Sequence, residues 1–185
     1  IDQQERTVPV VVTRDGRASA PFSATVARYS PALFTVSQFG SGPAVALNAA
    51  DGSFAHGVGA LPGRMSRPAR HGSVIAIYGN GLGGVTPSIP TGQVSPDIHR
   101  RTMANVEVLI GGRPADVLFA GLTGNVAGAN HLNVVVPADV PAGQAVPVQV
   151  RVGGVTSSAQ VTIAVEAGMT PTPALPEANG RSIWD

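Results

Sequence analysis

The sequence predicts an all-β fold, an antiparallel β-sandwich with an additional hairpin unit near its N-terminal end. Three observations support this prediction. The 185 residues include 23 glycines and 16 prolines, a share that disfavours long helices. Apolar residues recur at every second position in short runs, as they do on the buried face of a strand. Turn sequences separate these runs at short intervals, which is typical of sandwiches rather than of alternating strands and helices.

The first expected element is a hairpin. Val8, Val10 and Val12 alternate along the segment VPVVVTR, and Asp15-Gly16 supplies a turn that tolerates positive φ angles. The alternating segment FSATVAR (22–28) then provides the returning strand.

Further strands follow with the same alternation. The run VIAIY (74–78) leads into a glycine-rich turn, and the glycine pairs at 111–112 and 153–154 each connect two alternating segments. No segment has the apolar periodicity of a helix. After the first hairpin, the expected strands are 44–48, 53–58, 74–78, 106–110, 117–119, 132–136, 146–152 and 161–165.

The two ends of this pattern share a repeat. TVPVVVTRDGRAS (7–19) aligns with AVPVQVRVGGVTS (145–157), and an alternating return strand follows each copy. The sequence therefore starts with the kind of hairpin that ends its complete domain. Because a hairpin alone is only marginally stable in water, we expect residues 33–60, a neighbouring domain or another molecule to cover it.

Several segments resemble known families. The runs 69–84 (ARHGSVIAIYGNGLGG), 106–121 (VEVLIGGRPADVLFAG) and 131–165 are similar to IPT/TIG immunoglobulin-like domains. More closely, SPALF (30–34), AVALNAADGS (44–53), IYGNGLGGVTP (77–87), IGGRPADVLFAG (110–121) and NVVVPADVPAG (133–143) resemble an uncharacterised C-terminal domain of secreted acidobacterial, Solibacter-type proteins.

This resemblance covers roughly residues 7–166, although His131 stands where that family usually has glutamine. It implies an extracellular immunoglobulin-like sandwich without an assigned enzymatic activity, and it supplies no catalytic residue. We expect three parts: residues 1–62 with the hairpin and a partial immunoglobulin-like unit, residues 63–166 as an IPT/TIG-type sandwich, and residues 167–185 as a Pro-rich extended tail.

One motif imitates a nucleotide-binding site. Gly79, Gly81 and Gly84 satisfy the G-x-G-x-x-G spacing directly after an apolar strand. That motif works when a helix starts at the third glycine and directs its N-terminus at a pyrophosphate, but VTPSIPTG follows here, with two prolines. We therefore interpret GNGLGG as a positive-φ turn at the edge of the sandwich.

Other catalytic and metal sites find little support. Cysteine is absent, which excludes disulfides and thiolate metal sites. Asn48, Asp51 and Ser53 offer oxygen ligands, but they lack the series of a calcium loop, and a plain Asp-Gly turn is the preferred interpretation. We expect no enzymatic activity, no cofactor and no metal. The four histidines have no zinc-site spacing: His56, His71, His99 and His131.

The charge pattern bears on possible partners. All twelve basic residues are arginine, and the formal net charge is +1, too small for a nucleic-acid surface without strong clustering. No apolar run approaches the length of a membrane span. The loop with Arg64, Arg67 and Arg70 and the pair Arg100-Arg101 would bind an anionic polymer or, more simply, stay solvated.

The hairpin and the tail carry the functional hypothesis. We expect a non-catalytic structural subunit, secreted to the bacterial surface, that associates head to tail into a filament by β-strand addition. Val8, Val10 and Val12 are the expected apolar anchors, with Ile183 and Trp184 as secondary candidates. The alternative is a carbohydrate- or surface-binding accessory module of a larger secreted protein. Thr170 and Thr172 are O-glycan acceptors in one interpretation and part of an unmodified linker in the other.

Overall fold

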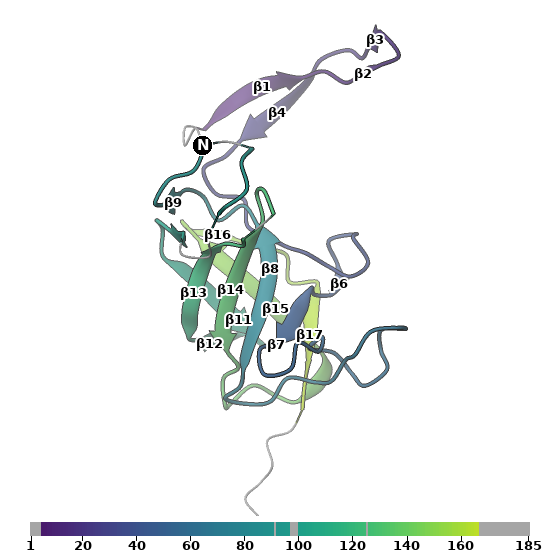
Figure 1. Ribbon diagram of the computed structural model, residues 1–185, viewed down its shortest axis with the longest axis vertical. Helices are drawn as coiled ribbons and strands as arrows, with labels where there is room; N and C mark the ends of the chain where they lie inside the picture. Colours follow the sequence, from purple (N-terminus) through teal and green to yellow (C-terminus); the bar gives the residue numbers. More distant parts are fainter. Residues whose placement is uncertain (1–4, 91, 97–99, 125, 167–185) are drawn as a thin grey trace, which may run out of the picture.

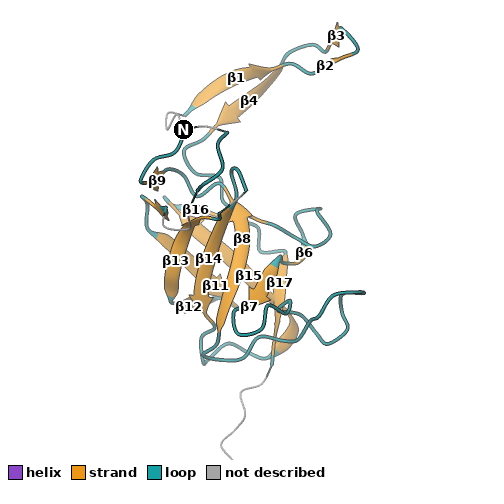
Figure 2. Ribbon diagram, in the orientation of Figure 1, coloured by secondary structure: helices purple, strands orange, loops and turns teal. Residues whose placement is uncertain are grey.

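The computed structural model describes residues 5–90, 92–96, 100–124 and 126–166, which form two packed β-sheets and a hairpin that stands off one pole (Figure 1). The secondary structure of these residues contains strands and loops but no helix (Figure 2). Consequently, the described chain offers no helix long and apolar enough to cross a membrane. The predicted β-sandwich is confirmed.

The first sheet consists of seven short antiparallel strands. In spatial order they are β5 (Ala32–Leu33), β8 (Val74–Asn80), β14 (Asn130–Val135), β13 (Val117–Leu122), β10 (Arg101–Thr102) and β9 (Val85–Thr86), with β7 (Ala46–Asn48) also paired to β8. Strands β5 and β7 share the same edge of β8, one beside each half of it.

The second sheet packs against the first. Its order is β12 (Arg113–Ala115), β11 (Val106–Ile110), β15 (Gly143–Val152), β17 (Val161–Val165) and β6 (Gly42–Pro43), with β16 (Val155–Thr156) paired to β15. All pairs are antiparallel except β6 with β17.

The core lies between the two sheets and follows the predicted alternation. Valine and isoleucine suit these strands because branched side chains pack well on a pleated surface. Inward-facing residues with no exposed surface include Ile75 and Ile77 of β8, Leu132 and Val134 of β14, and Val148 and Val150 of β15.

The expected boundary between residues 62 and 63 does not separate two sheets. Strands β5 and β7 pair with β8, and β6 pairs with β17, so residues 32–48 belong to the same sandwich as residues 74–165. The physical reason is that β17 has an edge to satisfy: the Thr162 and Ala164 carbonyls accept bonds from the N–H groups of Ala44 (2.9 Å) and Ala69 (2.8 Å). Among the strands of the described residues, those of the hairpin alone pair with neither sheet of the sandwich.

The hairpin contains four strands. β1 (Arg6–Val10) pairs with β4 (Phe22–Val26), and β2 (Thr13–Arg14) pairs with β3 (Arg17–Ala18) at the tip. Asp15 and Gly16 adopt φ angles of 50° and 74° in the connecting turn, as the Asp-Gly sequence predicts.

Candidate functional site

The hairpin has one apolar face and one polar face. Residues opposite each other in an antiparallel pair point to the same side of the sheet. Val8 lies opposite Ala24 and Val10 opposite Phe22, and Val26 follows on the same side, opposite Arg6. These five apolar residues form what we call the apolar face of the hairpin. The reverse side carries Thr7, Pro9, Ser23 and Thr25.

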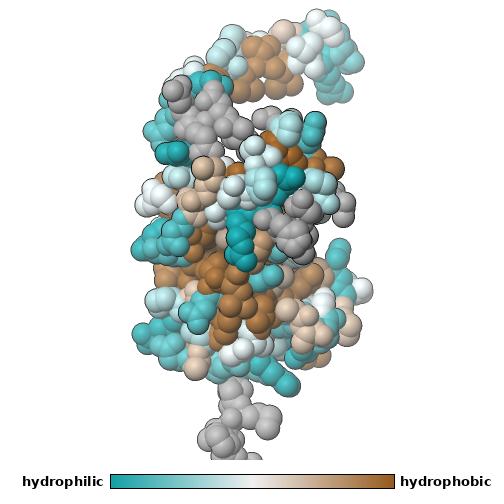
Figure 3. Space-filling view, turned by 60° about the vertical axis from the view of Figure 1, so that its left-hand side comes forward, coloured by the Kyte–Doolittle hydropathy of each residue, from teal (hydrophilic) through white to brown (hydrophobic). Residues whose placement is uncertain are grey.

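The apolar face is exposed at its end nearer the tip, at Val10 and Phe22, whereas Val8, Ala24 and Val26 are half-buried. Phe22 is 72% exposed and Val10 is 44% exposed, and Val12, nearer the tip, is 65% exposed. No other segment of the described residues covers them, and the apolar side chains lie bare at the top of the molecule in Figure 3. Isolated exposed apolar residues are ordinary, but a whole strand face of them indicates a contact surface.

The hairpin has the same local geometry as the hairpin that ends the sandwich. In β2–β3, Thr13 pairs with Ala18 and Arg14 with Arg17; in β15–β16, Arg151 pairs with Thr156 and Val152 with Val155. These are the positions that the sequence repeat aligns. The two turns match as well, since Gly153 and Gly154 adopt φ angles of 56° and 82°.

A serine fixes both hairpins in the same way. The Val12 N–H donates to the Ser19 hydroxyl oxygen (3.1 Å), and the Ser19 N–H donates to the Val12 carbonyl (2.9 Å). Val150 and Ser157 make the same two bonds at 2.9 and 2.8 Å. The sequence repeat therefore corresponds to a structural repeat.

The two copies differ in what covers them. Val146, Val148 and Val150 are exposed by 7%, 0% and 0%, because the opposite sheet packs on them. Their counterparts in the repeat are Val8, which is half-buried, and the exposed Val10 and Val12. The hairpin thus presents, uncovered, a surface of the kind that the sandwich buries.

A tyrosine anchors the base of the hairpin. The Tyr29 ring lies against the backbones of Gly83 and Gly153, where an added Cβ would approach its ring carbons to 2.7 and 2.2 Å. Next to it, the Ser30 N–H donates to the Gly81 carbonyl (3.0 Å), and a Cβ at Gly81 would lie 1.8 Å from the Ser30 carbonyl oxygen. The GNGLGG turn therefore receives the chain that leaves the hairpin.

This contact accounts for the imitation of a nucleotide-binding motif. Gly81 and Gly83 adopt φ angles of 77° and 86°, which confirms the predicted positive-φ turn, and no helix follows it. The sequence did not reveal Tyr29 as its partner. The available signal was glycine at every second position, which indicates close approach of another backbone along one side of a strand.

The predicted assembly residues fall in two groups. The structure places Val8 and Val10 in β1 of the hairpin and Val12 in the short segment between β1 and β2. Ile183 and Trp184, together with the possible O-glycan acceptors Thr170 and Thr172, lie outside the described residues. His99 also lies outside them.

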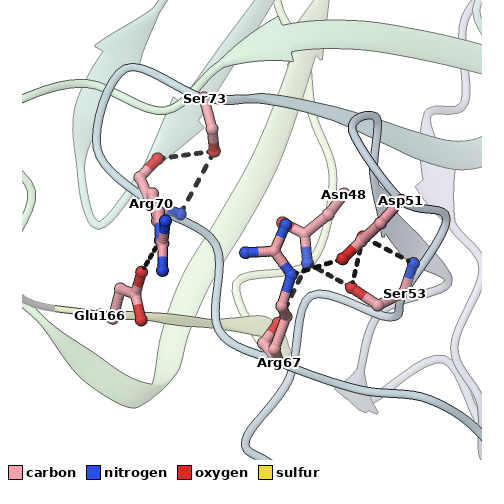
Figure 4. Close-up of polar contacts among 7 residues, drawn as sticks. All are labelled: Asn48, Asp51, Ser53, Arg67, Arg70, Ser73 and Glu166. Atoms are coloured by element: carbon pink, nitrogen blue, oxygen red, sulfur yellow. Dashed lines mark hydrogen bonds and ion pairs between the residues drawn. The ribbon is translucent and has the colours of Figure 1, made fainter.

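A polar cluster occupies the pole opposite the hairpin (Figure 4). The Asp51 carboxylate accepts from the Ser53 hydroxyl (2.7 Å), the Ser53 N–H (3.1 Å) and the Arg67 Nε–H (2.7 Å). These bonds, that from Arg67 above all, lower the pKa of Asp51 from 3.8 to about 2. The Asp-Gly turn forms as expected, and its carboxylate is engaged by protein groups rather than left for a cation.

A second arginine lies beside this turn. Arg70 donates through Nε to Glu166, while its backbone N–H and carbonyl bond the hydroxyl of Ser73. Arg67 and Arg70 line one pocket of about 470 Å³ with Asn48 and Ser73. The remaining pocket residues are Ala49, Ala50 and Val74.

An aromatic row crosses the outer surface of the first sheet. His131 stacks on Phe119 with ring centroids 4.5 Å apart, and the Arg101 guanidinium carbon lies 4.8 Å from the Phe119 centroid. The Phe119 ring therefore has two partners, a stacked imidazole and a guanidinium. Burial lowers the pKa of His131, which favours its neutral form.

His56 is structural. It is 3% exposed, and its Nε2 lies 2.8 Å from the Ala44 carbonyl, which makes Nε2 the protonated nitrogen. Burial lowers its pKa, partly offset by that bond. Among the residues that the structure describes, no three histidine, aspartate or glutamate side chains are grouped so as to hold a metal ion.

Comparison with protein-family models, with curated proteins and with solved structures finds no match for this chain. The function is therefore argued from the geometry of the hairpin and of the opposite pole.

Proposed function

We propose that the protein is a non-catalytic extracellular structural subunit that associates head to tail through its hairpin, forming a surface filament. The single observation that carries this proposal is the apolar face of the hairpin, on which Val10 and Phe22 are exposed and Val8, Ala24 and Val26 are half-buried. Full burial of one valine or phenylalanine side chain contributes about 1.5–3 kcal/mol, so covering this face would give a substantial driving force.

The strand order supports an immunoglobulin-like type for the sandwich. One sheet has the series β7, β8, β14 and β13, and the other has β12, β11, β15 and β17. In an immunoglobulin sandwich, whose strands are lettered A to G in chain order, one sheet has the order A, B, E, D and the other contains C, F and G. Here β7, β8, β14 and β13 correspond to A, B, E and D, and β11, β15 and β17 correspond to C, F and G. Such modules are common in extracellular proteins, which is consistent with the family resemblance of the sequence.

The positions of the two poles favour a linear arrangement. The hairpin extends from one end of the sandwich, whereas β17, the last described strand, runs to the opposite end (Figure 1). A contact between two different surfaces of the same chain repeats without closing on itself, unless its rotation closes a ring. In this proposal the segment 167–185 of one copy adds as a strand to the hairpin of the next copy. Ile183 and Trp184 of the added segment would then contact the apolar face of that hairpin.

The native particle size tests this function. We expect the chain to elute as particles larger than one copy in light-scattering chromatography, and to appear as filaments by electron microscopy. Val10→Asp, on the apolar face, is expected to yield single copies, and deletion of 167–185 to do the same. Thr25→Asp is the matched control, because it places the same charge on the polar face. A wild-type chain that remains a single copy over the whole concentration range contradicts the proposal.

A further inference from the structure

The pocket at the pole opposite the hairpin has an arrangement that the proposed function does not use. Its volume of about 470 Å³ lies within the range of small-ligand sites. Arg67 and Arg70 come from the same loop, and both line the pocket (Figure 4).

Each arginine is paired with an acid through Nε, which leaves its two terminal nitrogens available for another acceptor. Arg67 donates to Asp51 through Nε, and Arg70 donates to Glu166 through Nε. A guanidinium has five N–H donors, and its strongest pairing is a bidentate one to an oxyanion. The terminal nitrogens of both groups make no hydrogen bond to any described residue.

The acids therefore orient the arginines without saturating them. Asp51 is itself fixed by Ser53, and Arg70 by the Ser73 hydroxyl on its backbone. The charges of Arg67, Arg70, Asp51 and Glu166 sum to zero. Attraction of an anion to this pocket would therefore depend on directed hydrogen bonds at short range rather than on a long-range electrostatic field. An oxyanion that accepts from both guanidinium groups would offset the repulsion between their like charges.

We infer that this pocket binds a monosaccharide unit that carries a carboxylate or sulfate group, the oxyanion lying between Arg67 and Arg70. Ala49, Ala50 and Val74 give the pocket an apolar side for the carbon face of a sugar ring. Asn48 and Ser73 add polar atoms near its hydroxyl groups. The inference goes beyond the proposed function and does not depend on it, because the pocket and the hairpin lie at opposite poles.

A contrast within the molecule supports the choice of this pair. Arg113 with Asp139 (3.3 Å) and Arg151 with Glu107 (3.5 Å) are also ion pairs, with arginine side chains 55% and 48% exposed, against 65% for Arg70 and 32% for Arg67. Unlike Arg67 and Arg70, neither of these arginines lines the pocket. They are therefore suitable controls for the general effect of removing a surface charge.

The test is a titration of the isotope-labelled full chain, followed by backbone NMR signals, with sodium glucuronate, sodium sulfate, sodium chloride and uncharged glucose. We expect saturable shifts at residues 48–50 and 70–74 with glucuronate or sulfate, and none with glucose. Tighter binding of sulfate shows that the pocket prefers a sulfate group as its oxyanion, and tighter binding of glucuronate assigns a uronic acid. Shifts that do not saturate, or that chloride reproduces at equal ionic strength, overturn the inference.

Variants make the assignment specific. Arg70→Gln is expected to weaken binding about tenfold or more, because a charge-assisted hydrogen bond is lost. Arg70→Lys keeps the positive charge but loses the paired N–H donors of the guanidinium, so it is expected to weaken binding as well. Arg113→Gln is expected to leave the affinity unchanged. Equal affinity in all three variants contradicts the role of the arginine pair. Repeating the titration on Val10→Asp separates this result from any effect of assembly.

Discussion

The paired serines allow a test of how burial changes the value of one hydrogen bond. In Ser157→Ala the Val150 N–H loses its hydroxyl acceptor, now 2.9 Å away, at a position where Ser157 is only 6% exposed. A buried donor left without a partner costs about 1–3 kcal/mol. In Ser19→Ala the equivalent Val12 N–H lies at the exposed hairpin, where water replaces the hydroxyl, so we expect a change below about 0.5 kcal/mol.

Urea unfolding of both variants measures the difference, with the transition midpoint and slope compared to those of the parent chain. In thermal unfolding, Ser157→Ala should lower the Tm by about 2–4 °C per kcal/mol for a protein of this size. The reasoning fails if the two substitutions cost the same in a single-copy sample. It also fails if Ser157→Ala leaves the midpoint unchanged, since the sandwich would then tolerate an unpaired N–H at Val150.

The remaining predictions concern the turns at the two poles. A residue with a side chain in the left-handed conformation costs about 1–2 kcal/mol. Gly154→Ala, at φ 82° with open space around it, should lower the unfolding free energy by that strain alone, whereas Gly81→Ala should lower it by clearly more, because its Cβ would meet the Ser30 carbonyl oxygen. Equal unfolding midpoints of the two variants in urea would refute this. The Asp51 pKa, lowered from 3.8 to about 2, means that its contribution to stability is present above 3.8 and lost as the pH falls toward 2. The unfolding free energies of the parent chain and Asp51→Asn should therefore differ near neutral pH and converge near pH 2, and a constant difference would argue against the ion pair with Arg67.

Much of the sandwich could be predicted because its long strands carry their own signal. Val146, Val148, Val150 and Val152 alternate without interruption, and a glycine pair then fixes the turn. Such a segment specifies which face is buried, since shifting it by one residue would expose every valine. The same reasoning correctly placed β8, β11, β14 and β17.

The short edge strands could not be predicted from the sequence. β6 is Gly42–Pro43, and β10 is Arg101–Thr102, each only two residues long and without any alternation. They are strands because an exposed edge of β17 or of β13 offers them hydrogen bonds, which is a property of the neighbour rather than of the segment. The pairing of β5, β6 and β7 with strands beyond residue 62 has the same origin.

The site at the opposite pole was only partly foreseen. The sequence indicated an Asp-Gly turn near Asp51 and a basic loop with Arg67 and Arg70, but as separate features. Their convergence depends on the Asn48 side-chain amide, which donates to Ser53 (3.1 Å) and to the Arg67 carbonyl (3.1 Å) and so connects the turn to the loop. A bond between residues so far apart in the chain leaves no periodic pattern.

The repeated hairpin separates what a local sequence determines from what its surroundings determine. The serine bonds, the register and the turn are the same in both copies, although one copy is buried and the other is exposed. In the proposed assembly, the hairpin would therefore bind as a preformed element. Because a preformed element loses little conformational entropy on binding, more of the gain from burying Val10 and Phe22 remains available as affinity. Tyr29, packed against Gly83 and Gly153, extends this argument to the base, since it fixes the direction in which the hairpin is presented.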